Sequence, residues 1–179
     1  RNNKKGYQTY WVCTLVEESE ALQCRAAEKT AEALQEQLKT VRVGLIHGRM
    51  KSDEKEQLMT AFKQQEIDLL VATTVIEVGV AVPNANLMII ENPERLGLAQ
   101  LHQLRGRVGR SDIASYCVLL YQSPLSEAAQ RRLTIMRTTQ DGFKIAQADL
   151  EMRGPGEVLG TKQAGLMTFR VTNLLRDQH

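Results

Sequence analysis

The sequence predicts an α/β domain with a parallel β-sheet and helices on both faces. Short apolar runs of strand length alternate with longer stretches of helical pattern. The runs are apolar throughout, as strands buried on both faces are. Beyond about residue 122 the pattern changes to further helical stretches and a glycine-dense segment. We therefore expect a main domain over 1–122 and a smaller unit over 123–179.

The composition limits the functions that the chain can have. With 179 residues, 42% of them hydrophobic, it can bury one core with a small appendage. The net charge of +2 means that a nucleic-acid surface must be a local patch. Aromatic residues, at 4%, are too scarce for a single-strand binder that stacks bases on aromatic side chains.

Cysteine usage and hydropathy point to a reducing compartment. Cys13, Cys24 and Cys117 are widely spaced and form no CxxC pair, so neither a disulfide framework nor a zinc site is expected. No apolar run approaches the roughly 20 residues that span a membrane, and no signal peptide is visible. We expect a cytoplasmic protein and, because the chain has no initiator methionine, a piece of a longer one.

The first elements follow from the apolar pattern. A strand is expected over residues 10–15, and a long helix rich in Ala, Glu and Gln follows over about 19–38. The apolar run 41–46 predicts a second strand. Ser52 then offers a hydroxyl for an N-cap, with two acids in the next positions, where the helix dipole favours them.

The middle of the chain repeats this alternation. The apolar runs 68–72 and 87–91 predict the third and fourth strands. A helix over about 98–104 leads into an arginine-rich stretch, and a fifth strand is expected over 114–121.

The smaller unit is expected to begin with a helix. Ser123 and Pro124 suit its N-cap and first turn, because proline is tolerated at the first helical position. This helix is expected to end near Arg137. An amphipathic stretch from Gly142 and then the glycine-dense segment complete the chain.

The most informative stretch is 103–110, Gln-Leu-Arg-Gly-Arg-Val-Gly-Arg. Arginine offers a planar, permanently charged fork that matches phosphate oxygens, and glycine lets the backbone approach a ligand closely. Arg107 and Arg110 are three residues apart and can converge on one anion. The stretch predicts a phosphate clamp or arginine finger, although a basic surface loop would have the same composition.

Polar residues follow two of the expected strands. His47 and Gly48 come after the second strand, and Thr73 and Thr74 after the third. Ligands of open parallel sheets bind at the carboxyl ends of the strands. A hydroxyl and free backbone N–H groups at such an end can hold a nucleic-acid phosphate. Taken singly, His47 would more often be a hydrogen-bonded structural histidine, and Thr73 and Thr74 would simply be strand-end residues.

The sequence contains no P-loop. Gly160, Thr161 and Lys162 reverse the order that a P-loop requires, and no strand precedes the glycines at 154–160. No pair of acids at a strand end could hold magnesium and position a water. A phosphate clamp without a phosphate cradle predicts half of a site, with the other half on another domain.

Three stretches, 47–50, 71–80 and 91–110, resemble motifs of superfamily-two helicases. The resemblance is to the second RecA-like motor domain of the RecG family of bacterial ATP-dependent DNA helicases, and it runs from about residue 6 to 178. It implies a RecA-like sheet. The roles that it implies are catalytic for Arg107 and Arg110; nucleotide-binding for Gln103, Glu77 and Gly79; and DNA-binding for His47, Gly48, Thr73 and Thr74.

The C-terminal segment resembles a translocation motif shared by that family and the transcription-repair coupling factor. The matching residues are Gly142, Phe143, Asp149, Leu150, Arg153, Gly154, Gly156, Gly160 and Gln163. The resemblance implies a helical hairpin followed by an extended segment, with Arg153 and Gln163 coupling the motor to DNA movement. We expect Arg153 to hydrogen-bond toward the arginine stretch. The amino-acid sequence of the motifs favours the RecG family. The transcription-repair coupling factor and a stand-alone nucleic-acid-binding module remain the alternatives.

The resemblance also implies cofactors and partners. ATP and Mg²⁺ would be bound mainly by the first motor domain, so the present chain alone should be inactive. The partners would be branched double-stranded DNA, such as stalled forks and Holliday junctions, and the first motor and wedge domains of the same polypeptide. A monomer without membrane association is expected. Ala81 stands where the family has aspartate, which predicts a weakened affinity for ATP.

Overall fold

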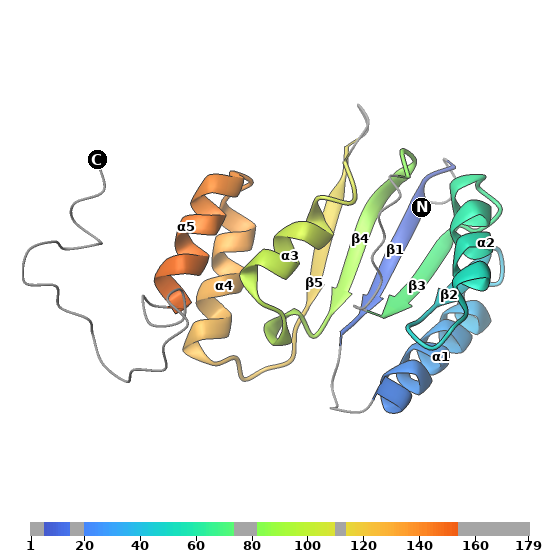
Figure 1. Cartoon of the computed structure of the whole chain (residues 1–179), viewed down its shortest axis with the longest axis horizontal. Coiled ribbons are helices and arrows are strands. Elements are labelled where there is room, and N and C mark those ends of the chain that lie inside the picture. The colour runs from blue at the N-terminus through green and yellow to red at the C-terminus, as the bar shows by residue number, and fades with distance from the viewer. Residues whose placement is uncertain (1–5, 15–19, 74–81, 110–113, 154–179) are drawn as a thin grey trace, which may run out of the picture.

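The computed structural model of the chain describes residues 6–14, 20–73, 82–109 and 114–153 (Figure 1). Its elements, in chain order, are β1 (Gln8–Cys13), α1 (Glu20–Gln37), β2 (Val43–Ile46), α2 (Ser52–Lys63), β3 (Leu69–Thr73), β4 (Ala85–Glu91), the short 3₁₀ helix η2 (Pro93–Arg95), α3 (Leu98–Arg105), β5 (Tyr116–Leu120), α4 (Glu127–Thr138) and α5 (Gly142–Arg153).

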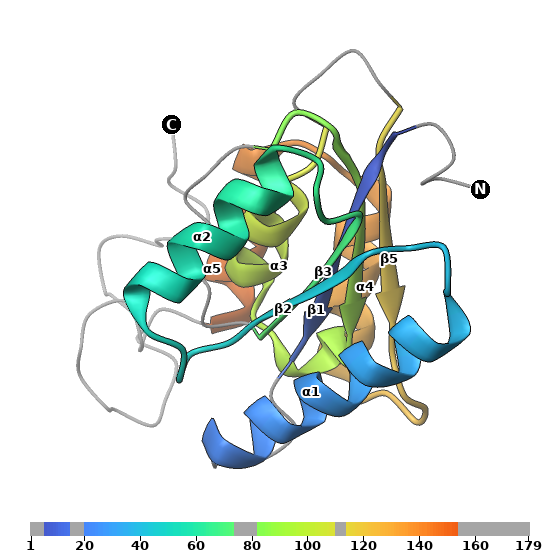
Figure 2. The same cartoon turned by 90° about the vertical axis from the view of Figure 1, so that its right-hand side faces the viewer.

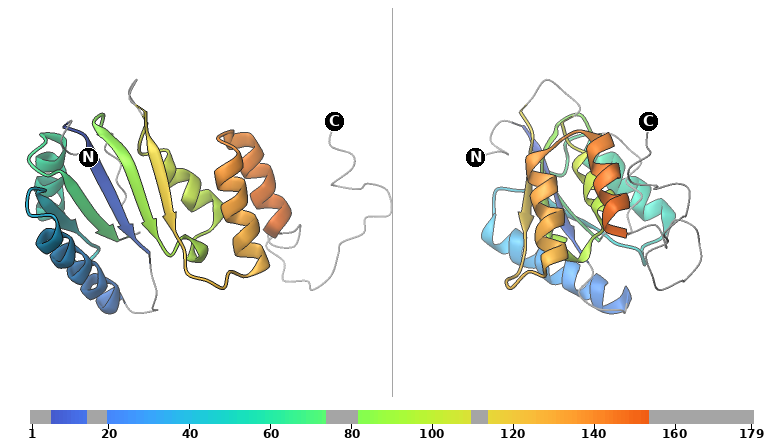
Figure 3. Two further views of the ribbon diagram at one scale, coloured as in Figure 1. Left: turned by 180° about the vertical axis from the view of Figure 1, so that it is seen from behind. Right: turned by 90° about the vertical axis from the view of Figure 1, so that its left-hand side faces the viewer.

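The strands form one parallel sheet in the order β2-β3-β1-β4-β5. Helix α1 lies on one face, and α2 and α3 lie on the other (Figure 2). Helices α4 and α5 lie side by side beyond the β5 edge of the sheet (Figure 3). The expected fold class, a parallel sheet with helices on both faces and a helical hairpin after it, is confirmed.

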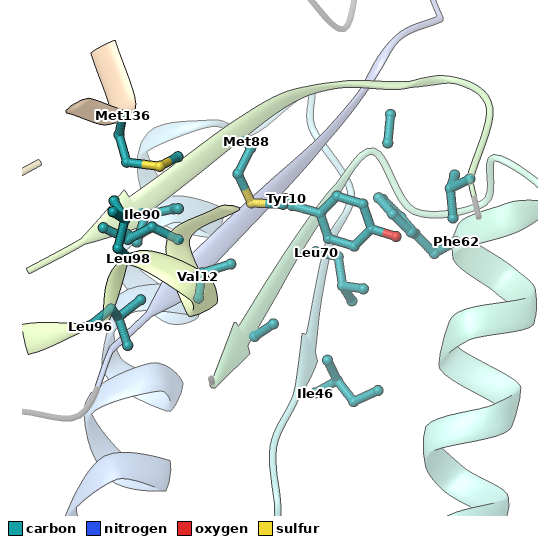
Figure 4. Packing of buried hydrophobic residues seen from close by; sticks show 14 of the residues in the cluster. Tyr10, Val12, Ile46, Phe62, Leu70, Met88, Ile90, Leu96, Leu98 and Met136 are labelled. Carbon is teal, nitrogen blue, oxygen red and sulfur yellow. The ribbon is translucent and has the colours of Figure 1, made fainter. Parts of the chain in front are cut away.

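The larger core lies between the sheet and the α2–α3 layer (Figure 4). The rings of Tyr10 and Phe62 meet edge to face, with centroids 4.9 Å apart. Leu98 and Leu101 of α3 are completely buried on the same face. A smaller cluster on the opposite face packs Ala27 of α1 against the sheet.

Strand β1 begins two residues earlier than its apolar run, because a polar side chain starts it. Gln8 is buried, and its Nε2 donates to the carbonyl oxygens of Phe62 and, at 2.7 Å, Ile67. A buried amide that bonds to the end of α2 is compatible with the core. The hydrophobic pattern alone could not show this.

Two expected helix caps are wrong. Lys51, rather than Ser52, is the N-cap of α2, and its backbone N–H donates to the Glu54 carboxylate at 3.1 Å. Helix α4 begins at Glu127, well after Pro124. Its N-cap is Ser126, whose Oγ accepts a hydrogen bond from the Ala129 N–H at 3.2 Å. In both cases the hydrogen bonds that close the first turn decide the boundary.

Strand β5 departs from the expected continuous burial. No described residue covers one face of this strand completely. On that face Tyr116 is 62% exposed, Val118 40% and Leu120 43%. Helix α1 packs on the same face of the sheet, mainly over β1, β2 and β3. The apolar run therefore predicted the strand correctly but not its exposure.

Arg42 and Asp68 join the starts of β2 and β3. Asp68 Oδ2 accepts from the backbone N–H and Nε of Arg42, both at 2.9 Å, and Oδ1 accepts from Nη2 at 2.8 Å. The hydrogen bonds from Arg42 hold the pKa of the Asp68 carboxyl below its ordinary value. Asp68 therefore stabilises the fold while it is ionised.

We expect Asp68→Asn to lower the urea midpoint of unfolding at pH 7 and to matter less in acid. The folded pKa of Asp68 is lowered, so its contribution is complete above the unfolded pKa of about 4 and is lost as the pH falls through the folded pKa. Urea titrations of the wild type and variant at pH 7, 5 and 3 measure this. Glu36→Gln, on the exposed side of α1, is the control. A difference between wild type and D68N that stays constant down to pH 3 would contradict the expectation.

Candidate functional site

The parallel strands bring their carboxyl ends to one edge of the sheet. Ile46 pairs with Ala72, so His47 and Thr73 follow at the same end of neighbouring strands. Cys13 pairs with Thr73 on one side and with Glu91 on the other. The predicted strand-end residues thus lie along one edge, where ligands of such sheets bind.

A cavity of about 130 Å³ lies between this part of the sheet and α3. It is lined by Tyr10, Val12, Ala72, Thr73, Met88, Leu96, Gln100, Gln103, Leu104 and Arg107. Three residues predicted from separate motifs, Thr73, Gln103 and Arg107, therefore lie around one space. The described residues that line it include arginine, amide and hydroxyl groups but no carboxylate.

Helix α3 places the two residues of the arginine stretch at the cavity. The helix starts after Gly97, whose N–H donates to Gln100 Oε1 at 3.0 Å, and it is fixed by the burial of Leu98 and Leu101. Gln103 lies in its last turn, and Arg107 follows its end, where the Arg107 N–H donates to Leu104 O at 3.0 Å. Residues four apart can face the same side of such a turn.

Gly109 has a φ of +80°, a conformation that side chains disfavour. A Cβ atom at this position would also lie 3.3 Å from the hydroxyl of Ser115. The glycine between the last two arginines is thus required by the backbone turn itself.

Thr73 is 3% exposed, and its hydroxyl makes no hydrogen bond with another described residue. A buried hydroxyl without a partner is costly, and a ligand oxygen can remove that cost. Six positions with predicted roles lie outside the described residues: Thr74, Glu77, Gly79, Ala81, Arg110 and Gln163. Their placement remains a prediction.

His47 and Gly48 do not line the cavity. The His47 side chain is largely buried, with Nε2 3.8 Å from Glu28 Oε1 of α1, while its Nδ1 has no hydrogen-bond partner among the described residues. The carbonyl of Gly48 accepts from Lys55 Nζ at 2.8 Å. The β2–α2 turn is therefore a second polar position on the same edge of the sheet, apart from the cavity.

Arg105 has a role that the sequence did not reveal. Its guanidinium Nη1 donates to the carbonyl oxygens of Met136 and Thr139, both at 2.8 Å, at the end of α4. Gln103 and Arg105 are two positions apart, which is roughly 200° around a helix. The periodicity of the helix therefore indicated that Arg105 points away from Gln103 and the predicted phosphate clamp.

Arg132 makes a second connection to α4. Its Nη2 donates to the carbonyl oxygen of Glu94 in η2 at 2.8 Å. Two further atoms here, Glu94 Oε2 and Arg132 Nε, are buried without a hydrogen-bond partner among the described residues. Nothing in the apolar pattern singled out either residue.

Arg153 does not reach the described part of the arginine stretch. It ends α5 and pairs with Asp149, with Nη2 and Oδ2 2.9 Å apart. Its side chain is 52% exposed. Among the described residues Arg153 thus pairs within its own helix, and a hydrogen bond toward Arg110 stays a prediction.

The thiols of Cys13 and Cys117 remain in their unreactive, protonated form. All three thiols are free. Burial is the main cause that raises the pKa of Cys13 to about 12 and that of Cys117 to about 11, so both remain protonated at neutral pH. Within the described ranges no group of three or more His, Cys, Asp or Glu side chains could hold a metal ion, and no helix there is long and apolar enough to cross a membrane.

Comparisons with known proteins cover nearly the whole chain. Residues 2–112 match the helicase conserved C-terminal domain, and residues 139–179 match the C-terminal part of domain 3 of the ATP-dependent DNA helicase RecG. The boundary expected near residue 122 falls between these matches and stays a prediction.

Several curated relatives of this chain are ATP-dependent DNA helicases named RecG. The chain is 67% identical to the ATP-dependent DNA helicase RecG of Escherichia coli K12 over 174 residues and 53% identical to that of Staphylococcus aureus N315 over 175 residues. Each match covers 97% of this chain and 25% of the relative, so the chain spans about a quarter of its curated relatives.

Solved structures of helicases also match this chain. RecG bound to a three-way DNA junction matches with a TM-score of 0.75 and 45% identity, over 96% of this chain and 21% of that one. The C-terminal domain of the DEAD-box protein Dbp5, at 17% identity, a TM-score of 0.53 and coverage of 76% and 73%, shares the fold. The chain thus belongs to the family of helicase conserved C-terminal domains, and its expected resemblance to RecG is confirmed.

Proposed function

We propose that this chain is the second motor domain of an ATP-dependent DNA helicase that remodels branched DNA in recombination and repair. One observation carries the proposal: Thr73, Gln103 and Arg107 lie around one cavity in a chain whose sequence has no P-loop. The arrangement offers donors to phosphate oxygens without the loop that would cradle them. It fits one side of a nucleotide site between two domains.

The residues present suit the proposed nucleotide chemistry. The guanidinium of Arg107 and the amide of Gln103 can donate hydrogen bonds to phosphoryl oxygens. No described carboxylate lines the cavity, so none would repel the negatively charged phosphoryl group. When bound on the first motor domain, Mg²⁺ would neutralise phosphate charge. Arg107 and Arg110 would stabilise the charge that develops on the transferred phosphoryl group. The chain's own contribution is therefore electrostatic, and the nucleotide would be held mainly by the other domain.

The DNA side of the proposal rests on the edge of the sheet. His47, Gly48, Thr73 and Thr74 would contact the DNA backbone, and closure of the motor domains around ATP would move it. The relative solved with a three-way junction supports branched DNA as the substrate, with the first motor and wedge domains supplied by the same polypeptide. We infer a monomer acting in the bacterial cytoplasm, since the relatives are bacterial.

The two alternatives are less well supported. The match of residues 139–179 to RecG domain 3 favours RecG over the transcription-repair coupling factor. A stand-alone nucleic-acid-binding module would need a broad basic face, which a net charge of +2 does not supply.

Because this chain is proposed to supply only one side of the nucleotide site, we predict that it hydrolyses no ATP on its own. Adding the separately purified first motor domain and forked DNA should produce DNA-dependent hydrolysis, measured as phosphate release. The first motor domain with forked DNA but without this chain is the control. Hydrolysis by this chain alone would overturn this proposal.

In the full-length protein, Arg107→Ala and Arg110→Ala should each lower the kcat of DNA-stimulated hydrolysis by 100-fold or more, since arginine fingers contribute about 10³–10⁵ in rate. Affinity for forked DNA should stay within about twofold of the wild type, because neither residue is proposed to contact DNA. Arg25→Ala, on the exposed side of α1, is the matched control. Near-normal hydrolysis by either finger variant would refute its catalytic role.

We also propose that Arg153 and Gln163 couple hydrolysis to DNA movement. Arg153→Ala in the full-length protein should keep hydrolysis and lose unwinding. Asp149→Asn removes the ion pair but keeps the guanidinium, so it should unwind normally. Intact unwinding by the Arg153 variant, measured on a labelled fork, would contradict this role.

A further inference from the structure

Helix α3 carries polar groups on two different sides. Gln103 lies at the cavity, whereas Arg105 and His102 contact the segment that joins α4 to α5. His102 and Arg105 are three positions apart and therefore neighbours on the helix surface. The same short helix thus contacts the proposed nucleotide site and the helical hairpin.

The contact of Arg105 with α4 is specific. The last carbonyl groups of a helix lack partners within it and carry partial negative charge. Arg105 Nη1 donates to one such group, Met136 O, and also to the carbonyl of the C-cap residue Thr139, each at 2.8 Å. Its Nη2 lies 3.3 Å from Nδ1 of His102. One guanidinium therefore both caps α4 and is held in place by its own helix.

The start of α5 lies equally close to α3. A Cβ atom at Gly142 would lie 3.2 Å from His102 Nε2, so the glycine permits this approach. The preceding Asp141 caps α5, since its Oδ1 accepts from the Phe143 N–H at 2.9 Å. The α4–α5 connection is thus an ordered turn that contacts α3.

We propose that Arg105 is a positioning residue that transmits the movement of α3 to the α4–α5 hairpin. The proposal rests on the function proposed above. Arg107 follows α3 by two residues, so attraction of Arg107 to a phosphoryl group would pull on the last turn of this helix, beyond the buried Leu98 and Leu101. The two hydrogen bonds of Arg105 would then move the end of α4 with it. Arg105 itself takes no part in binding the nucleotide.

The test uses the full-length protein and compares Arg105→Gln with the wild type on forked DNA. The measured quantity is base pairs unwound per ATP hydrolysed, which we expect to fall at least tenfold. Arg105→Lys keeps the charge but not the planar fork, and it should recover part of this loss. Arg131→Gln is the matched control, because Arg131 forms an ion pair with Glu151 at 3.5 Å within the hairpin and does not bond to α3.

A second readout separates transmission from simple support of the fold. In the wild type, ADP with aluminium fluoride should change amide hydrogen exchange over residues 137–145, and this change should vanish in Arg105→Gln. If that variant does not fold, Arg105→Lys is measured in the same two ways. The proposal is overturned by a wild-type unwinding ratio in the Arg105 variant, an equal loss in Arg131→Gln, or a nucleotide response that persists without Arg105. A wild-type protein without DNA-dependent hydrolysis would instead refute the proposed function.

Discussion

The seating of α3 on the sheet is the constraint on which the site depends. Leu98 and Leu101 are completely buried, and burial of a leucine side chain contributes about 1.5–3 kcal/mol. A single hydrogen bond contributes only about 1 kcal/mol net. The apolar side of the helix therefore fixes its position, and the polar side chains on its other sides can be used for ligands and for contact with α4. Loss of this seating would displace Gln103, Arg105 and Arg107 together.

Arginines that lie close in sequence have separate surroundings in the structure. Arg107 lines the cavity, where nothing described pairs with its charge, whereas Arg105 is bound to two backbone carbonyl groups. Carbonyl partners satisfy a guanidinium without neutralising it, so the stretch stays strongly positive as a whole. Helix α3 ends at Arg105 with Gly106 as its C-cap, and Arg107 lies in the turn that follows, where its backbone N–H donates to Leu104 O. This turn allows one charged stretch to serve two surfaces.

Features that depend on the local sequence could be predicted, whereas features that depend on how distant elements pack could not. Continuous apolar runs predicted all five strands and the parallel sheet, because strands of such a sheet carry apolar side chains on both faces. The exposed face of β5 was not predictable, since Tyr116 and Val118 are as apolar as buried residues and their exposure depends on where α1 packs. Likewise, the two carbonyl groups that accept hydrogen bonds from Arg105 are brought to it only by the packing of α4. The convergence of Thr73, Gln103 and Arg107 was predictable in outline, because parallel strands share one carboxyl edge.

The size of the cavity fits the proposal that the arginine stretch acts across an interface between two domains. Sites that enclose a small ligand usually measure about 300–1,000 Å³. The cavity beside α3 is about 130 Å³, enough for a few atoms that approach Arg107 but not for a whole nucleotide. A nucleotide held elsewhere could engage Arg107 and Gln103 only when another surface closes on this one. Arg107 would then contact the nucleotide only after the two domains have closed. In the proposed mechanism, α3 transmits this contact to the α4–α5 hairpin through Arg105.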